Sequence, residues 1–151
     1  MVINFVCTGN TCRSPMASAL YYKHLKEKGI HYVQCEDSGL GAYEGDPVSA
    51  NAVEACKEMD VDISRHTTHR LRGADIVKSN FFVVMEPVHR EVLIEAGVNS
   101  NQIHLLGGPN GIKDPYGADI ETFRTVRDQI MAGFEELDEI IFTKAKEAWA
   151  K

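Results

Sequence analysis

Long hydrophobic runs and excess positive charge are both missing from this sequence. No apolar stretch in its 151 residues approaches the length of a membrane-spanning helix, and the first residues have the pattern of a short strand, not of a signal peptide. Sixteen basic against 22 acidic residues give a formal net charge of −6, which argues against nucleic acid or an anionic membrane as a partner. We therefore expect a cytoplasmic protein.

Cysteine is also scarce, and several common signatures are absent. Four cysteines are compatible with disulfides, but a reduced, intracellular setting fits a reactive thiol better. No Gly-Lys-Ser/Thr element is present, which excludes nucleotide binding by a Walker A loop. Internal repeats, low-complexity tracts and interdomain linkers are lacking too. The length suffices for one core without staples, so we expect a single domain over residues 1–151.

The first twenty residues carry the strongest local pattern. Val2 to Val6 is a short run rich in β-branched residues, which predicts a buried strand. From Ser14 onward the apolar residues are spaced as in a helix, with Ser14 as its expected cap and Pro15 in its first turn. The intervening loop, from Cys7 to Arg13, therefore joins a strand to a helix N-terminus.

Such a loop directs several backbone N–H groups at one point, which favours an oxyanion such as phosphate. Gly9 lets the backbone take the left-handed or strained angles that such a cradle usually needs, and Arg13 has a planar fork for two phosphate oxygens. These donors should lower the pKa of Cys7 and make it a phosphoryl-transfer nucleophile. The plainer alternative is a buried strand-end cysteine beside a solvated arginine.

The rest of the chain alternates strand-like and helix-like segments. This alternation predicts an α/β fold with a doubly wound, parallel, four-stranded sheet and helices on both faces, in three layers. Ligands then bind at the carboxyl ends of the strands, where Cys7 lies. The predicted strands are 30–35, 81–85 and 103–106, and the predicted helices are 49–59, 86–96 and one last helix that runs to the C-terminus with a stripe from Phe123 to Trp149.

The loop resembles that of the low-molecular-weight protein phosphatases, C-x-G-N-x-C-R-S-P. The matching positions are Cys7, Gly9, Asn10, Cys12, Arg13, Ser14 and Pro15. The resemblance implies that Thr8 to Ser14 bind phosphate, that the Ser14 hydroxyl donates to the sulfur of Cys7, and that Ser38 and His66 hydrogen-bond Asn10. It places Tyr43 in a wall of the cleft.

A cysteine phosphatase also needs an acid to protonate its leaving group. The family's acid lies in a late D-P-Y loop, and Asp114-Pro115-Tyr116 is the match in this sequence. The resemblance thus implies a phosphocysteine intermediate formed by Cys7, Arg13 and Asp114, with no metal or organic cofactor. His66 and His69 are spaced to share a face, but no third metal ligand is suitably placed. Cys12 is a possible reversible redox partner of Cys7.

The expected partner is a phosphorylated protein, bound by a monomer. Tyrosine-specific members often carry a bulky aliphatic residue where this chain has Thr11, so the loop looks like that of the protein-arginine phosphatase branch. The hydroxyl of Thr11 suits a water or a guanidinium group, with Tyr43 and Tyr116 completing the pocket. Phosphoarginine is favoured, and phosphotyrosine is the alternative. A phosphate-binding redox sensor remains open, whereas an arsenate reductase would need cysteines after Cys56.

Overall fold

The sheet has four strands in the order β2-β1-β3-β4, and every neighbouring pair is parallel. The computed structural model describes residues 1–150. The strands are β1 (Val2–Cys7), β2 (Gln34–Gly39), β3 (Phe81–Val84) and β4 (Ile103–Leu105). The expected parallel four-stranded α/β sheet is therefore confirmed. Central β1 and β3 are apolar because both of their faces are covered.

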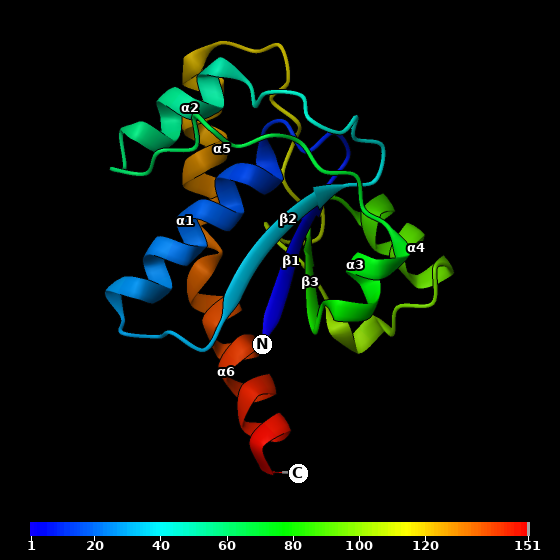
Figure 1. Ribbon diagram of the computed structural model, residues 1–151. Coiled ribbons are helices and arrows are strands. Elements are labelled where there is room, and N and C mark those ends of the chain that lie inside the picture. The colour runs from blue at the N-terminus through cyan, green and yellow to red at the C-terminus, as the bar shows by residue number, and fades with distance from the viewer. Residues whose placement is uncertain (151) are drawn as a thin grey trace.

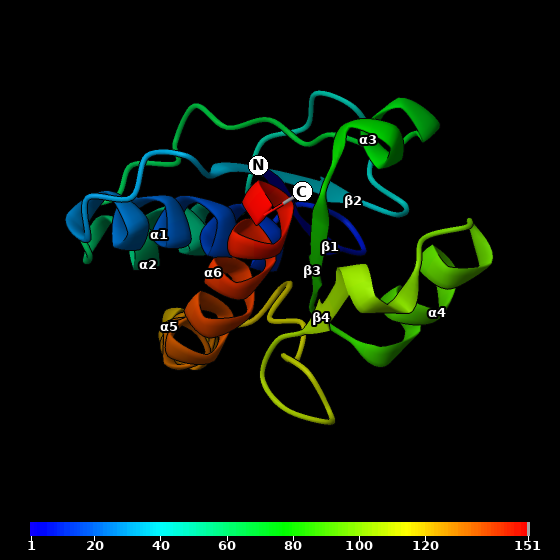
Figure 2. The ribbon, with the colours of Figure 1, turned by 90° about the horizontal axis from the view of Figure 1, so that it is seen from below.

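Helices cover both faces of this sheet (Figures 1 and 2). Helices α3 (Gly73–Lys78) and α4 (Pro87–Glu95) lie on one face, where a smaller apolar cluster forms around Val6, Phe82 and Leu93. The other helices lie on the opposite face, over the main core, which includes Phe5 and Tyr21. The helices are α1 (Arg13–Glu27), α2 (Ala50–Lys57), α3 (Gly73–Lys78), α4 (Pro87–Glu95), α5 (Ile120–Ala132) and α6 (Phe134–Ala150), with a 3₁₀ turn η1 (Ser100–Gln102).

Two predicted elements had wrong boundaries and one helix was missed, each for a physical reason. The second strand is 34–39 instead of 30–35, because β2 is an edge strand whose exposure tolerates polar residues. The last helix is two helices separated at Gly133, where a Cβ atom would lie 2.6 Å from the side chain of Leu106. Helix α3 was not predicted at all, because its six residues are too few for a clear periodicity.

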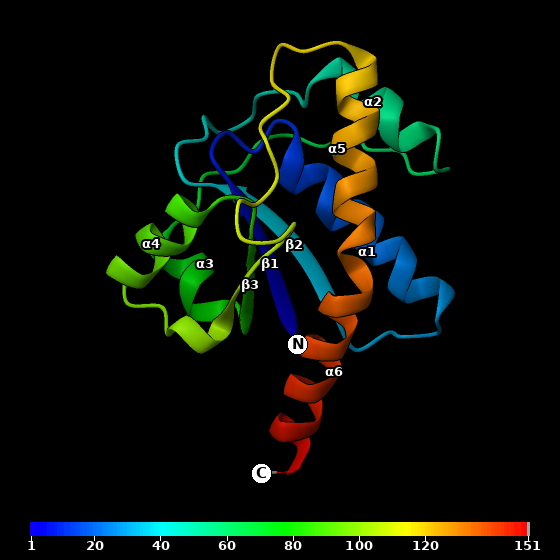
Figure 3. The same cartoon turned by 180° about the vertical axis from the view of Figure 1, so that it is seen from behind.

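The strands all end at the same edge of the sheet, where the chain passes into the loop after β1, the segment after β2 and the residues after β3. Figure 3 shows the segment between β4 and α5 crossing this same end. Both chain ends lie toward the opposite end of the molecule (Figure 1). Among residues 1–150, no helix is both long and apolar enough to span a membrane.

Candidate active site

The loop after β1 is shaped by Asn10, which has the left-handed φ of 58°. Its side-chain amide donates to Ser14 Oγ at 2.7 Å and to Asp37 Oδ1 at 2.8 Å, and its carbonyl accepts from the backbone N–H of His69 at 2.8 Å. These three bonds hold a backbone conformation that non-glycine residues rarely adopt. Gly9, expected to allow left-handed or strained angles, has no positive φ, and the left-handed position is Asn10.

Gly39 makes the close approach of this loop to β2 possible. A Cβ atom at Gly39 would lie 2.7 Å from the carbonyl oxygen of Thr8 and 2.9 Å from the nitrogen of Asn10. The loop backbone therefore rests directly on the end of β2, where a side chain would displace it. Nothing in the sequence around Gly39 pointed to this requirement.

The structure corrects the expected contacts of Ser38 and His66 with Asn10. The Ser38 hydroxyl donates to Asn4 Oδ1 at 2.8 Å, and the Ser38 carbonyl accepts from Ser14 Oγ at 3.3 Å. His66 Nε2 lies 2.9 Å from Asp37 Oδ1, an ion-pair distance without hydrogen-bond geometry. Within residues 1–150 neither Ser38 nor His66 bonds Asn10 directly. Each contacts a residue, Ser14 or Asp37, that accepts a hydrogen bond from the Asn10 amide.

Cys7 is buried at the base of the loop, with 2% of its surface exposed. Its Sγ lies 2.9 Å from Ser14 Oγ and accepts from the backbone N–H of Asn10 at 3.3 Å. Ser14 is therefore the thiol's neighbour inside α1, and not the helix cap that was expected. Burial raises the pKa of the Cys7 thiol, whereas Ser14, Arg13 and the Asn10 N–H favour the thiolate. The expected lowering of this pKa is outweighed by desolvation.

Arg13 is equally buried, and two acceptors fix its guanidinium. Its Nη1 donates to Glu86 Oε2 at 2.8 Å and to the Ile112 carbonyl at 2.7 Å, while Nη2 lies 3.7 Å from Asp114 Oδ2. Glu86 lies two residues after the end of β3, at the carboxyl edge of the sheet where ligands bind in this architecture. Its carboxylate reaches the site from this edge. Glu86 was not predicted as a site residue, although its place just after a strand was a usable signal.

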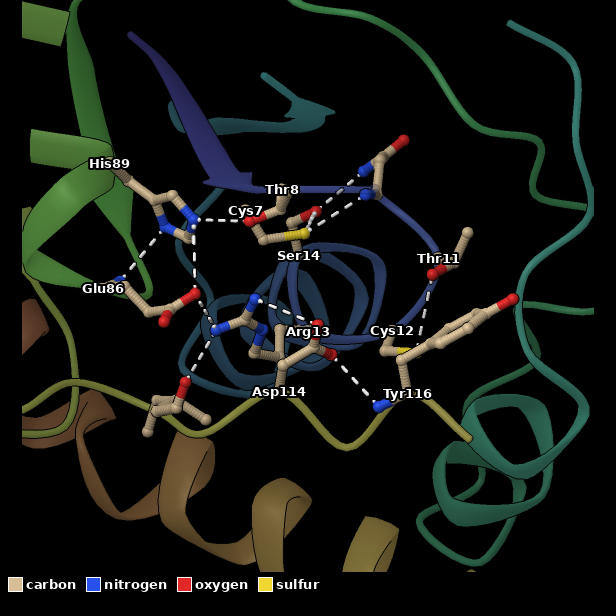
Figure 4. A network of polar contacts seen from close by, with 12 residues as sticks. Cys7, Thr8, Thr11, Cys12, Arg13, Ser14, Glu86, His89, Asp114 and Tyr116 are labelled. Atoms are coloured by element: carbon tan, nitrogen blue, oxygen red, sulfur yellow. Dashed lines mark hydrogen bonds and ion pairs between the residues drawn. The ribbon is translucent and has the colours of Figure 1, made fainter. Parts of the chain in front are cut away.

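Asp114 lies on the loop that crosses this edge, and its side chain is half exposed. Its Oδ1 accepts from the backbone N–H of Tyr116 at 3.1 Å, an Asx turn that sets the carboxylate's direction. The loop is anchored where Ile112 N–H donates to the Met85 carbonyl at 2.7 Å. Arg13 therefore contacts both the loop's backbone and its acid (Figure 4).

A cleft of about 270 Å³ brings these groups together. Tyr43 and Tyr116, 79% and 72% exposed, lie at its walls, and Thr11 lines it beside the thiol. The residues predicted for nucleophile, arginine, acid and substrate pocket thus share one cavity, whereas Ser38 and His66 lie outside its lining. The lining consists of Cys7, Thr8, Gly9, Thr11, Cys12, Arg13, Gly41, Ala42, Tyr43, Asp46, Asp114 and Tyr116.

Cys12 is the second thiol of this cleft. Its Sγ lies 3.0 Å from Ser49 Oγ and 3.6 Å from Thr11 Oγ1, and burial raises the pKa of its thiol. All four cysteines of the described chain are free. Cys56, predicted to be a core residue, is fully buried, and burial raises the pKa of its thiol to about 12. Within residues 1–150, no group of three or more potential metal ligands comes together.

A buried histidine behind the loop was also missed by the sequence analysis. His89, 1% exposed, accepts from the backbone N–H of Glu86 through Nδ1 at 3.1 Å. Its Nε2 lies 2.9 Å from Thr8 Oγ1 (Figure 4). Burial, together with the charge of Arg13, lowers the pKa of His89 to about 4. A histidine in the first turn of a helix carries no sequence signal for such a contact with residue 8.

Comparison with known proteins decides the family. The family model described as low molecular weight phosphotyrosine protein phosphatase matches residues 2–147. The chain belongs to this family. A protein-arginine-phosphatase from Geobacillus stearothermophilus is 32% identical over 148 residues, which cover 94% of this chain and 97% of that protein.

Solved structures of the family have the same fold. A low molecular weight protein tyrosine phosphatase from T. tengcongensis is 32% identical, with a TM-score of 0.86 over 92% of this chain and 98% of that chain. A mutant of the YwlE arginine phosphatase with a phosphorylated active-site serine is 27% identical, with a TM-score of 0.85 over 92% of this chain and 94% of that chain. The site described above therefore belongs to a low-molecular-weight protein phosphatase.

Proposed function

We propose that this phosphatase removes phosphate from arginine side chains of proteins, with Cys7 as nucleophile, Arg13 as phosphate ligand and Asp114 as acid and base. The observation that carries the proposal is the single cleft that holds the Cys7 thiol, the Arg13 guanidinium and the Asp114 carboxylate. Nucleophile, charge stabiliser and proton donor are the three parts that phosphoryl transfer to a thiol requires.

In the first step the Cys7 thiolate attacks phosphorus in line with the leaving group. A sulfur–phosphorus bond forms as the bond from phosphorus to the leaving atom breaks, while the loop N–H groups and Arg13 hold the equatorial oxygens. Protonated Asp114 gives its proton to the leaving nitrogen or oxygen. The Ser14 hydroxyl and the Asn10 N–H, at 2.9 and 3.3 Å from the sulfur, stabilise the thiolate.

In the second step water releases the phosphate. Asp114, now ionised, takes a proton from a water molecule while the oxygen of that water attacks phosphorus. The sulfur–phosphorus bond breaks and returns the Cys7 thiolate. Inorganic phosphate leaves, and Asp114 is protonated for the next cycle. The phosphorylated active-site serine of the YwlE arginine phosphatase mutant supports a covalent intermediate at the corresponding position of the loop.

Phosphoarginine is favoured over phosphotyrosine because of Thr11. This side chain lines the cleft where tyrosine-specific members often have a bulky aliphatic residue that packs on an aromatic ring. Its hydroxyl suits a guanidinium N–H or a water, and the acidic residues Asp46 and Asp114 in the lining suit a cation. The similarity to a protein-arginine-phosphatase over 94% of the chain supports the same choice.

Phosphotyrosine remains the second candidate, favoured by the two exposed aromatic rings of Tyr43 and Tyr116 at the cleft walls. Aromatic walls gain stacking energy from a phenyl phosphate that they do not gain from a small substrate. The structure from T. tengcongensis, described as a protein tyrosine phosphatase, is equally similar in sequence.

Substitution of Thr11 by isoleucine tests the substrate. We expect the wild-type protein to prefer phosphoarginyl peptides, and Thr11→Ile to shift the ratio of kcat/KM toward phosphotyrosyl peptides by about tenfold or more. The measurement is turnover of both peptides by both proteins, side by side. A wild-type preference for phosphotyrosine that Thr11→Ile leaves unchanged would make Thr11 incidental.

Redox control and cellular setting are further parts of the proposal. Cys7 and Cys12 line the same cleft, which supports a reversible disulfide that protects the nucleophile from overoxidation. Recovery of peroxide-inactivated enzyme by dithiothreitol tests this, and a loss that persists without overoxidised Cys7 contradicts it. Four free thiols support a reducing, cytoplasmic location, and the proposal includes a monomer, since Cys7, Arg13 and Asp114 of one chain suffice for the proposed chemistry.

A further inference from the structure

Behind the phosphate loop lies a buried side chain that the two chemical steps do not use. His89 comes from the first turn of α4, on the face of the sheet opposite α1, and reaches the loop 81 residues earlier in the chain. Figure 4 shows its ring between Glu86 and Thr8. A fully buried imidazole with both nitrogens engaged has one defined proton position, which the surrounding contacts determine.

The tautomer of His89 follows from its two neighbours. The backbone N–H of Glu86 is purely a donor, so Nδ1 at 3.1 Å from it must accept and carries no proton. In the neutral ring the proton is therefore on Nε2. Two acceptors lie near Nε2: Thr8 Oγ1 at 2.9 Å and Glu86 Oε2 at 3.5 Å. Nε2 donates to the nearer one, so the hydroxyl oxygen of Thr8 accepts.

This assignment sets the direction of the Thr8 hydroxyl. Because its oxygen accepts from His89, its own proton is free to donate elsewhere. Thr8 is exposed and lines the cleft directly after the nucleophile. A donor in this place adds to the backbone N–H groups that face an oxyanion.

We propose that neutral His89 is a positioning residue of the phosphatase: it orients the Thr8 hydroxyl so that this hydroxyl donates to an oxygen of the bound phosphoryl group. The relay runs from the Glu86 N–H to Nδ1, from Nε2–H to Thr8 Oγ1, and from the Thr8 O–H into the cleft. It rests on the oxyanion-binding part of the proposed function and is independent of which phosphorylated residue is the substrate.

The charged groups around the ring favour this neutral state. Arg13 on α1 disfavours a second proton on the ring, whereas Glu86, directly before α4, and Asp114, on the loop between β4 and α5, favour one. Burial also opposes the charge. Protonation would place an N–H on Nδ1 against the Glu86 N–H, two donors face to face, and would break the first link of the relay.

Two amide substitutions distinguish the roles of the two ring nitrogens of His89. His89→Gln places a side-chain N–H near the position of Nε2 and keeps the donor to Thr8. His89→Asn places a carbonyl near the position of Nδ1, keeps the acceptor for Glu86 and loses the donor. Both variants replace the buried ring, but His89→Asn leaves the larger gap because its side chain is one methylene shorter. Coupling of the substitution to Thr8 therefore separates the relay from a role confined to packing.

The experiment measures the dissociation constant for inorganic phosphate, and kcat and KM for an aryl phosphate, at neutral pH. We expect His89→Asn to weaken phosphate binding about tenfold and His89→Gln to stay within about threefold of the wild-type protein. Thr8→Val should weaken phosphate binding as much as His89→Asn does. The double variant, Thr8→Val with His89→Asn, should bind phosphate no more weakly than Thr8→Val alone. Thermal unfolding of each variant controls for folding.

Equal losses in His89→Asn and His89→Gln would overturn the relay, as would additive losses in the double variant. A wild-type protein that binds no phosphate would overturn it together with the proposed function. A wild-type protein that binds phosphate and hydrolyses the aryl phosphate, yet prefers phosphotyrosyl peptides, would change only the proposed substrate and leave the relay intact.

Discussion

At the scale of single residues, the environment of Cys7 is a balance of opposing effects. Burial to 2% exposure disfavours the thiolate, while the Ser14 hydroxyl, the Arg13 charge and the Asn10 N–H favour it. The groups that favour the thiolate are the loop elements proposed to receive phosphate. The Cys7 thiolate and the bound phosphate are therefore stabilised by the same donors, but a change of the sulfur alone leaves those donors in place.

Replacement of Cys7, the proposed nucleophile, tests this separation. Cys7→Ser should abolish turnover, with kcat reduced at least about 10³-fold, because a serine hydroxyl is a far weaker nucleophile than a thiolate. Phosphate affinity should remain within a fewfold, since the loop N–H groups and Arg13 persist. Steady-state kinetics and phosphate titration measure the two quantities, and appreciable turnover by Cys7→Ser would refute Cys7 as nucleophile.

The proposed role of Asp114 as acid is tested by how its replacement changes the rates for different leaving groups. Asp114→Asn cannot donate a proton, so it should slow poor leaving groups by about 10²-fold or more and affect good ones much less. The measurement is kcat/KM across aryl phosphates of graded phenol pKa. Equal slowing of all the substrates would mean that Asp114 is not the acid.

The sequence predicted the chemical residues better than the residues that hold them. Cys7, Arg13 and Asp114 belong to two short motifs, and the structure brings them into one cleft. Glu86 and His89 touch the loop from more than 70 residues away, through contacts that no local pattern encodes. Ser38 contacts Ser14 through its carbonyl, and His66 contacts Asp37, whereas the expected side-chain bonds to Asn10 are not formed. A hydrogen-bond partner depends on side-chain geometry, which a sequence pattern does not give.

At the scale of elements, the loop between β4 and α5, which carries Asp114, is held in place by its backbone. Gly111 has a φ of 73°, and a Cβ atom there would lie 2.2 Å from the Met85 carbonyl oxygen. The next residue, Ile112, bonds both the sheet and Arg13. This loop's packing could not be predicted from its composition, although the sheet that supports it could, since strands alternate with helices along the chain.

A pair of glycine substitutions tests this anchoring. Gly111→Ala should lower the free energy of unfolding by about 2–4 kcal/mol and reduce kcat, because the loop must move away from Met85. Gly108→Ala is the matched control: its φ of 85° carries a similar strain, but nothing lies within 4 Å of the added methyl. Chemical unfolding and aryl phosphate kinetics of both variants measure the difference. Similar losses in the two variants would show that the close approach does not matter.

At the scale of the whole molecule, His89 makes stability depend on acidity. Its pKa is about 4 in the folded protein and near the ordinary value of 6.5 in the unfolded chain. Between these values the unfolded chain binds the extra proton, so this group's contribution is complete above about pH 6.5 and is lost as the pH falls toward 4.

The unfolding free energy measures this dependence. Between about pH 6.5 and 4, His89 should contribute a slope approaching 1.4 kcal/mol per pH unit to the wild-type protein. His89→Gln does not titrate, so the difference between the two proteins should shrink by that slope as the solution is acidified. Denaturant titrations at several pH values give both curves, and a constant difference would show that His89 does not carry this proton linkage.

The start of β1 and the last turns of α6, up to Ala150, lie at the end of the molecule opposite the cleft (Figure 1). A fluorescent reporter, an affinity handle or a surface tether joined to either end leaves the cleft open to large protein substrates. The architecture therefore suits immobilised formats, in which trapped phosphoproteins are captured from solution and identified.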